Sequence, residues 1–175
     1  MPRLSRRGLL AGVAWAPLVG CGYHVSGHAD LLPKSVKTIA VPAFANNTTR
    51  FRLSDRLAQS VTREFLSRTR YAVVHDINSA DAILRGSVLN LLAFPATFDT
   101  ATGRAAGVQI SVYVQINLQE RATGKLLYTN PSMEVRERYE ISIDPLAYFE
   151  ESEVALDRLS KQVAGSIVSA ILEAF

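Results

Sequence analysis

The sequence is short of the residues that build most catalytic and metal centres. It has one cysteine, Cys21, so a disulfide within the chain is impossible and the fold must be stabilised by packing. It contains no glycine-rich phosphate loop, no Gly-x-Ser-x-Gly elbow and no His-Glu-x-x-His motif. We therefore predict no catalytic residue, no cofactor and no metal site, and a protein that is not an enzyme.

Two histidines and a run of glutamates do not change this prediction. His24 and His28 are four residues apart, but they lie in a glycine-containing segment where this spacing defines no common face for a metal. Glu150, Glu151 and Glu153 resemble an acid/base cluster, yet carboxylates also favour the first turn of a helix. We interpret the histidines as solvated linker residues and the glutamates as a solvated helix start.

The excess of positive charge belongs to the first residues of the chain. The formal net charge is +3, and Arg3, Arg6 and Arg7 precede an apolar run, as in the n-region of a signal peptide. Without these three, the 19 basic residues fall to 16, which equals the 16 acidic residues. A protein without net charge lacks the electrostatic footprint that polyanions need, so we predict no nucleic-acid partner.

The segment Leu18-Val19-Gly20-Cys21 is typical of a bacterial lipoprotein cleavage site, because small residues follow an apolar run from Leu9 to Val19. The thiol of Cys21 is the only side chain there that can take a thioether-linked diacylglyceryl group. The alternative is a signal-anchor helix with a buried thiol. However, the run is far shorter than the ~20 residues of a membrane span, and it contains Pro17. We predict a membrane-tethered periplasmic lipoprotein that is lipidated at Cys21.

This interpretation divides the chain into three parts. Residues 1–20 form the lipoprotein signal peptide, residues 21–35 form a lipidated tether, and residues 36–175 form one α+β domain, long enough to bury a core. Acyl chains contribute ~0.8 kcal/mol per buried methylene, so such a tether stays on its bilayer. Adjacent Arg6 and Arg7 also fit a twin-arginine signal, which leaves the export route open.

Hydrophobic periodicity predicts a helix–sheet–helix order. Leu53, Leu57, Val61 and Phe65 recur every fourth residue, and Leu66 widens this stripe. Asp144-Pro145 has the form of a helix N-cap followed by proline at the first helical position. The expected elements are strand 36–44, helix 51–68, strands 71–75, 82–95, 107–120 and 126–142, and a helix from Pro145 to near Phe175.

The strand at 107–120 determines the predicted architecture. Its even-numbered residues from Val108 to Leu118 are apolar and its odd-numbered residues are polar, without a break. A strand with this alternation is buried on one face only, which is typical of an antiparallel sheet. We predict a two-layer α+β sandwich, with two helices packed on one face of a mostly antiparallel sheet of four to five strands.

This strand is unusual in carrying no charge before Glu120, so its polar face is uncharged. Solvated strands usually recruit charged residues, whereas uncharged amides and hydroxyls suit a wet, hydrogen-bonded interface. The polar lumen of a large outer-membrane barrel would provide such an interface. Alternatively, this face of the strand is exposed to solvent only. We favour a partner-facing surface, formed by Gln109, Ser111, Tyr113, Gln115 and Asn117.

Four segments in this order resemble one known family. They are Cys21-Gly22-Tyr23-His24, the Leu32-Pro33 step, the strand Val36-Lys37-Thr38-Ile39-Ala40-Val41-Pro42 that continues to Asn46-Asn47-Thr48, and Ala80-Asp81-Ala82-Ile83-Leu84-Arg85-Gly86. Their combination resembles the lipopolysaccharide-assembly lipoprotein family LptE, over essentially the whole chain after the signal peptide.

The resemblance implies a small outer-membrane lipoprotein that sits as a plug inside the barrel protein LptD. The pair would place lipopolysaccharide in the outer leaflet, and the lipoprotein would also help the barrel to assemble. The family associates basic residues with lipopolysaccharide binding, and the matching residues here are Arg104, Lys125, Arg136 and Arg138. Arginine suits bidentate contact with lipid A phosphates. Alternatively, these arginines pair with Glu134, Glu137 and Glu140, which lie close in sequence.

Two other classes of protein remain open from the residues alone. The chain could be a structural or ligand-binding lipoprotein of another envelope secretion or pore complex. It could also be an envelope enzyme whose site has no recognisable motif. Co-purification with a large barrel protein would distinguish the LptE-like function from these two classes. A small-molecule pocket lined by titratable groups would favour an enzyme.

Overall fold

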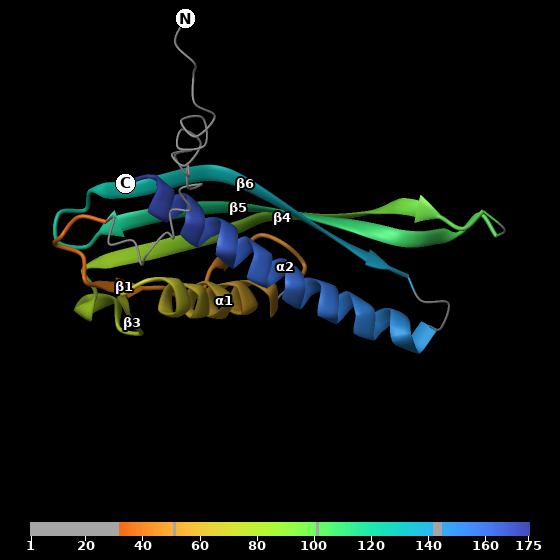
Figure 1. The fold of residues 1–175 in the computed structure, drawn as a ribbon, viewed down its shortest axis with the longest axis horizontal. Coiled ribbons are helices and arrows are strands. Elements are labelled where there is room, and N and C mark those ends of the chain that lie inside the picture. The colour runs from red at the N-terminus through yellow and green to blue at the C-terminus, as the bar shows by residue number, and fades with distance from the viewer. Residues whose placement is uncertain (1–31, 51, 101, 142–144) are drawn as a thin grey trace, which may run out of the picture.

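A computed structural model describes residues 32–50, 52–100, 102–141 and 145–175, with backbone alone for 145–152. Cys21, the signal peptide, most of the tether and Asp144 lie outside these residues. The helices are α1 (Arg52–Arg68) and α2 (Pro145–Glu173), and a short 3₁₀ turn spans Ile77–Ser79. The strands are β1 (Thr38–Ala40), β2 (Ala45–Asn46), β3 (Ala72–Val74), β4 (Ala82–Phe98), β5 (Ala105–Glu120) and β6 (Leu126–Glu140) (Figure 1).

The sheet has six strands, one or two more than the sequence predicts. Its order is β3-β1-β4-β5-β6, and β2 pairs with β4 beside this path. The extra strand is β2, which begins after the end of the predicted strand 36–44. Pro42, which cannot donate to a ladder, lies between β1 and β2. The pairs that involve β1 and β2 are parallel, and the long β4-β5-β6 ribbon is antiparallel.

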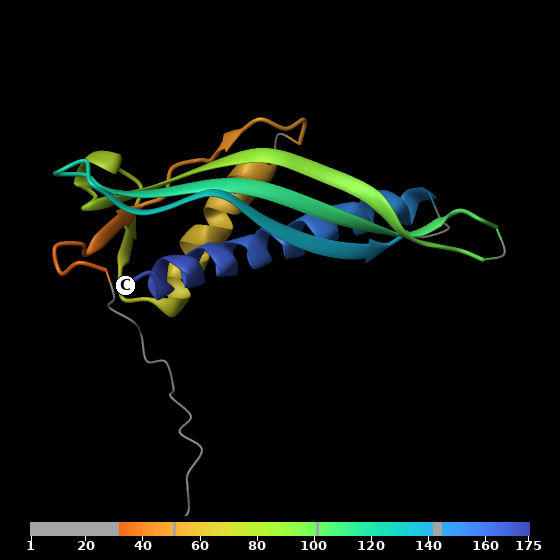
Figure 2. The same ribbon diagram turned by 90° about the horizontal axis from the view of Figure 1, so that it is seen from above.

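Both helices lie on one side of this sheet (Figure 2), which confirms the predicted two-layer α+β sandwich. On α1, the every-fourth-residue stripe from Leu53 to Phe65 is buried, as expected. Leu66 is 57% exposed, so its assignment to the stripe is wrong. One residue turns a helix by about 100°, which carries Leu66 away from the layer that buries Phe65.

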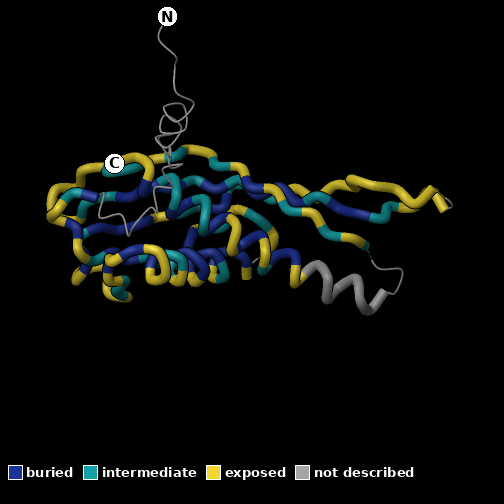
Figure 3. The backbone as a smooth tube through the Cα atoms, viewed as in Figure 1, coloured by how far each residue is buried: buried dark blue, intermediate teal, exposed yellow. Residues whose placement is uncertain are grey.

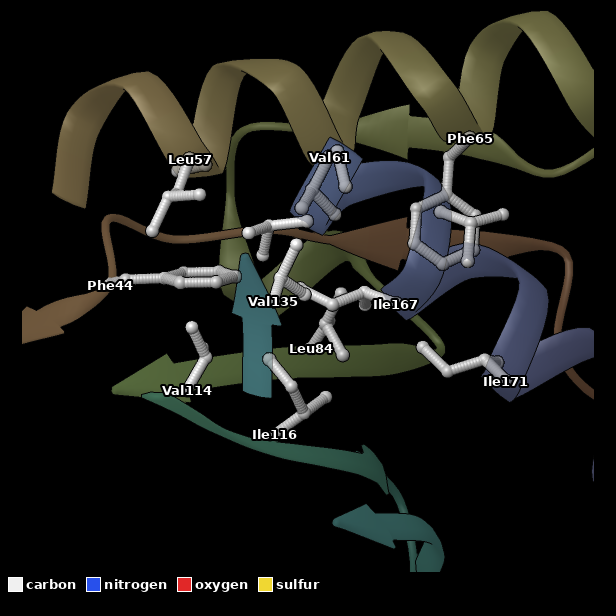
Figure 4. Packing of buried hydrophobic residues seen from close by; sticks show 14 of the residues in the cluster. Phe44, Leu57, Val61, Phe65, Leu84, Val114, Ile116, Val135, Ile167 and Ile171 are labelled. Atoms are coloured by element: carbon white, nitrogen blue, oxygen red, sulfur yellow. The ribbon is translucent and has the colours of Figure 1, made fainter. Parts of the chain in front are cut away.

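The core fills the space between the helices and the inner face of the sheet (Figure 4). The even-numbered residues of β5 from Val108 to Leu118 contribute to it from the sheet and are buried. Leu159, Val163 and Ile167 contribute from α2 and are each 0% exposed. Leu32 is also buried, and its backbone N–H donates to the Tyr71 hydroxyl at 3.0 Å. The chain is therefore docked on the domain at the first residue described.

A β-bulge in β4 reverses which side chains face the helices. Before the bulge, Leu84 and Val88 pair with Leu118 and Val114 on the inner face. The register shifts between Val88 and Asn90. A one-residue shift moves every later side chain to the other face. Leu92 and Phe94, which pair with Ser111 and Gln109, consequently lie on the outer face of the sheet.

Asp81 joins the first residues of β1 and β4. One of its oxygens, Oδ2, accepts hydrogen bonds from the backbone N–H of Lys37 (2.9 Å), from that of Thr38 (3.0 Å) and from the Thr38 hydroxyl (2.9 Å). These bonds, first the one from Lys37, hold the pKa of Asp81 below its usual range. The charged carboxylate thus stabilises the parallel register of the two strands.

We expect Asp81→Ala to lower the free energy of unfolding by about 1 kcal/mol near neutral pH, a small value because the carboxylate is half-exposed. Since the folded pKa is depressed, the stabilisation is complete above the unfolded pKa of about 3.9 and is lost as the pH falls through the folded value. Denaturant titrations of both proteins at several pH values measure this. A difference that persists at acid pH would contradict the assignment, and Asp81→Asn isolates the charge.

Candidate functional site

The outer face of the sheet, turned away from both helices, carries the polar residues of β5, and we call it the open face. Gln109, Tyr113, Gln115 and Asn117 are half-buried there, and Ser111 is buried. The register with β6 aligns this row with polar residues, whereas β4 places polar residues beside it as far as Asn90 and the apolar Leu92 and Phe94 beyond. For example, the Thr129 hydroxyl of β6 donates to Asn117 Oδ1 at 2.7 Å. The structure thus brings the five predicted face residues together in one line.

Charged residues of β6 also lie on the open face, opposite the polar row. Arg136 donates from Nε and Nη2 to the two carboxylate oxygens of Glu134, at 2.8 and 2.9 Å. The Tyr113 hydroxyl donates to the same carboxylate at 3.0 Å. The bond from Arg136 lowers the pKa of Glu134, and the bond to Glu134 raises the pKa of Tyr113. The charges here are thus compensated by each other.

The sequence analysis left open that the predicted lipopolysaccharide-binding arginines pair with Glu134, Glu137 or Glu140. In the described residues this is true of Arg136 alone, which pairs with Glu134. Glu137 faces the helices and accepts from Arg158 Nε of α2 at 2.9 Å. Arg138 instead donates to Gln109 Oε1 at 3.1 Å. Within the described part of the chain, neither Arg138 nor Arg104 forms an ion pair.

The four predicted basic residues do not form one cluster. Arg104 lies in the turn between β4 and β5, and Lys125 lies in the turn between β5 and β6. These turns are at opposite ends of β5, whose 16 residues span roughly 50 Å. Lys125 therefore cannot share a ligand phosphate with Arg104. Arg136 and Arg138 lie on the half of β6 that is nearer Arg104, because they pair with Ser111 and Gln109.

Three exposed apolar side chains, which the sequence analysis missed, lie beside these cations. Leu92 is 41% exposed, Phe94 42% and Phe98 61%. Leu92 pairs with Ser111 and Phe94 with Gln109, so both lie across β5 from the arginines of β6. The part of the β4–β5 hairpin beyond Leu92, which we call the distal hairpin, is the most exposed part of the sheet (Figure 3). The signal in the sequence was the change in parity of the apolar residues after Val88.

The described residues contain no group of three histidine, cysteine or acidic side chains placed to hold a metal ion. Glu153, from the glutamate run at the start of α2, pairs with Arg56 of α1. The side chains of Glu150 and Glu151 lie outside the described part. No helix among the described residues has both the length and the apolar character needed to cross a membrane.

Several solved structures share this fold. A lipoprotein B from Nitrosomonas europaea is 17% identical, with a TM-score of 0.54 over 87% of this chain and 96% of that one. A lipoprotein from Caulobacter crescentus is 15% identical (TM-score 0.52; 79% and 89%), and rare lipoprotein B from Shewanella oneidensis is 17% identical (TM-score 0.50; 78% and 94%). At these identities the likeness shows the fold alone, and the three proteins compared are each described as a lipoprotein.

The sequence comparison identifies the family. The family model LptE, described as lipopolysaccharide-assembly, matches residues 36–171. The chain belongs to this lipopolysaccharide-assembly family, as its motifs predict. None of the curated proteins compared with the chain is a significant match.

Proposed function

We propose that the chain is an outer-membrane lipoprotein, anchored through Cys21, that plugs an LptD-type barrel, helps that barrel to assemble and takes part in placing lipopolysaccharide in the outer leaflet. The family match over residues 36–171 carries this proposal. The open face supports the plug role through its own chemistry. Its amides and hydroxyls offer hydrogen bonds to a polar lumen, and the Glu134–Arg136 pair avoids an uncompensated charge in a confined site.

Gln115 is well placed for such a contact. It is half-buried at the middle of the polar row, and its amide makes no hydrogen bond to any residue that the structure describes. An amide in this state has its full hydrogen-bonding capacity available to a partner. In contrast, Tyr113 and Asn117 already have partners on β6.

The distal hairpin has the mixed character that an anionic amphiphile requires. Arg104 and Arg138 supply cations without a carboxylate partner among the described residues, and Phe94 and Phe98 supply exposed apolar surface. Lipid A combines phosphates with acyl chains, so this end is where we place contact with lipopolysaccharide. Arg136 contributes less because Glu134 neutralises it, and Lys125 belongs to the opposite end of the sheet.

Photo-crosslinking in cells tests the proposal. A crosslinking residue at Gln115 or Asn117 is expected to trap a large outer-membrane barrel, because the open face would line the lumen. A crosslinker at Arg63, which is exposed on α1, is the matched control and should trap much less. A crosslinker at Phe98 should trap lipopolysaccharide. If the open-face positions trap a different envelope assembly or nothing, the plug role is wrong and another secretion or pore complex is favoured.

A further inference from the structure

Residues at the start of the described chain and at the end of α1 line a basic pocket. The start of the described chain lies at the end of the domain opposite the distal hairpin (Figure 2). Its volume is about 400 Å³. Three cationic side chains line it, and no carboxylate does. The lining residues are Leu32, Pro33, Lys34, Val36, Lys37, Arg70 and Tyr71.

The backbone holds this pocket in one shape. The Val36 N–H donates to the Pro33 carbonyl at 2.8 Å, and the Leu32 N–H donates to the Tyr71 hydroxyl at 3.0 Å. Leu32, Val36 and Tyr71 are buried, so the wall of the pocket is apolar while its cations are exposed. A preformed site of this kind loses little conformational entropy when it binds a ligand.

Two carboxylates contact the backbone or side chains of residues 35–37 and accept hydrogen bonds there. Asp81 accepts from the backbone N–H of Lys37, and Glu120 accepts from the Ser35 hydroxyl at 3.0 Å. Neither forms an ion pair with a lysine ammonium, and within the described residues Lys34 and Lys37 have no ion-pair partner. The pocket therefore combines an apolar wall with the ammonium groups of Lys34 and Lys37, and this combination suits a phosphate that carries an organic group.

The position of the pocket identifies the source of that phosphate. Leu32 follows Cys21 by eleven residues, and a fully extended chain of that length reaches at most about 40 Å. If Cys21 is lipidated, as in the proposed function on which this inference rests, the pocket stays close to the headgroups of one leaflet. We propose that this pocket binds the phosphate headgroup of an anionic phospholipid in the leaflet that holds the anchor, and so orients the domain on its membrane.

The test uses the acylated protein purified from membranes and reconstituted in lipid nanodiscs. Discs of phosphatidylcholine are compared with discs that also contain phosphatidylglycerol, and amide hydrogen exchange is read at Leu32, Val36 and Ala72, whose N–H groups are bonded at the pocket. Exchange is expected to slow by about tenfold in the anionic discs, since basic residues near an anionic surface each contribute several-fold to binding.

Charge reversal separates the pocket from general attraction. The double variant Lys34→Glu/Lys37→Glu should lose the protection, whereas Arg52→Glu/Arg63→Glu, which reverses two exposed charges on α1, should keep it. Equal loss in both variants, or no difference between the discs, would overturn the proposal. Equal protection by dissolved inorganic phosphate in phosphatidylcholine discs would also overturn the lipid as the source. If the purified protein carries no acyl mass and does not enter the discs, the lipid anchor of the proposed function is wrong.

Discussion

Replacing Phe65 by alanine is expected to lower the free energy of unfolding by about 3–5 kcal/mol. Phe65 is 0% exposed and is among the largest fully buried side chains of the core, which both helices and the sheet surround (Figure 4). Truncation removes the apolar surface of the ring and leaves a cavity that the neighbouring branched side chains fill only in part. Urea unfolding monitored by far-UV circular dichroism measures the loss.

The neighbouring residue is a matched control. Leu66 is 57% exposed, so Leu66→Ala should change stability by less than about 0.5 kcal/mol. If the two variants are equally destabilised, then α1 does not present the face that buries Phe65. An unchanged Phe65→Ala protein would mean that α1 is not part of the cooperative unit.

This pair of residues shows how far periodicity predicts the fold. A repeat of four apolar residues identified α1, its buried face and its bounds to within one residue. It could not decide the side of a leucine next to the stripe, because a helix turns by about 100° per residue and the limits of the buried face depend on what packs against it. The sixth strand was missed for a related reason. β2 has two residues, and its pairing with β4 is a tertiary contact without a sequence period.

The part of the candidate site that lies on β5 was predictable, because the alternation of apolar and polar residues decides which side chains face outward. The bulges beside the polar row lie in β4 and β6 and not in β5, so the side chains of β5 alternate without a break from Gln109 to Asn117 and its five open-face residues were placed correctly. The neighbours of that row were not predictable, since they depend on bulges in β4 and β6 that shift the pairing. For the same reason, the sequence did not reveal that Phe94 faces the same side as Arg138. The separation of Lys125 from Arg104 required the sheet topology.

Replacing Gly86 by alanine is expected to destabilise the domain by about 1–3 kcal/mol, because the added methyl group has no space. A Cβ atom at Gly86 would lie 2.4 Å from the ring of Phe44, which is buried on the inner face of the sheet. The matched substitution Gly165→Ala should have the opposite sign. Its Cβ would meet only Glu64 Oε1 at 3.6 Å, and alanine favours a helix interior over glycine by roughly 0.5–1 kcal/mol.

The double variant Phe44→Leu/Gly86→Ala isolates the contact. A leucine is smaller than the aromatic ring, so in this background the added methyl group should cost less, with a coupling of at least about 0.5 kcal/mol in denaturant titrations. Additive losses would show that Gly86 is needed for another reason. Phe44 lies in the segment from Val36 to Thr48 that resembles the family, and Gly86 ends the segment from Ala80 to Gly86. The contact therefore gives a packing reason for both segments to occur in one chain. The ring of Phe44 packs directly on the backbone of β4, and this requires glycine at position 86.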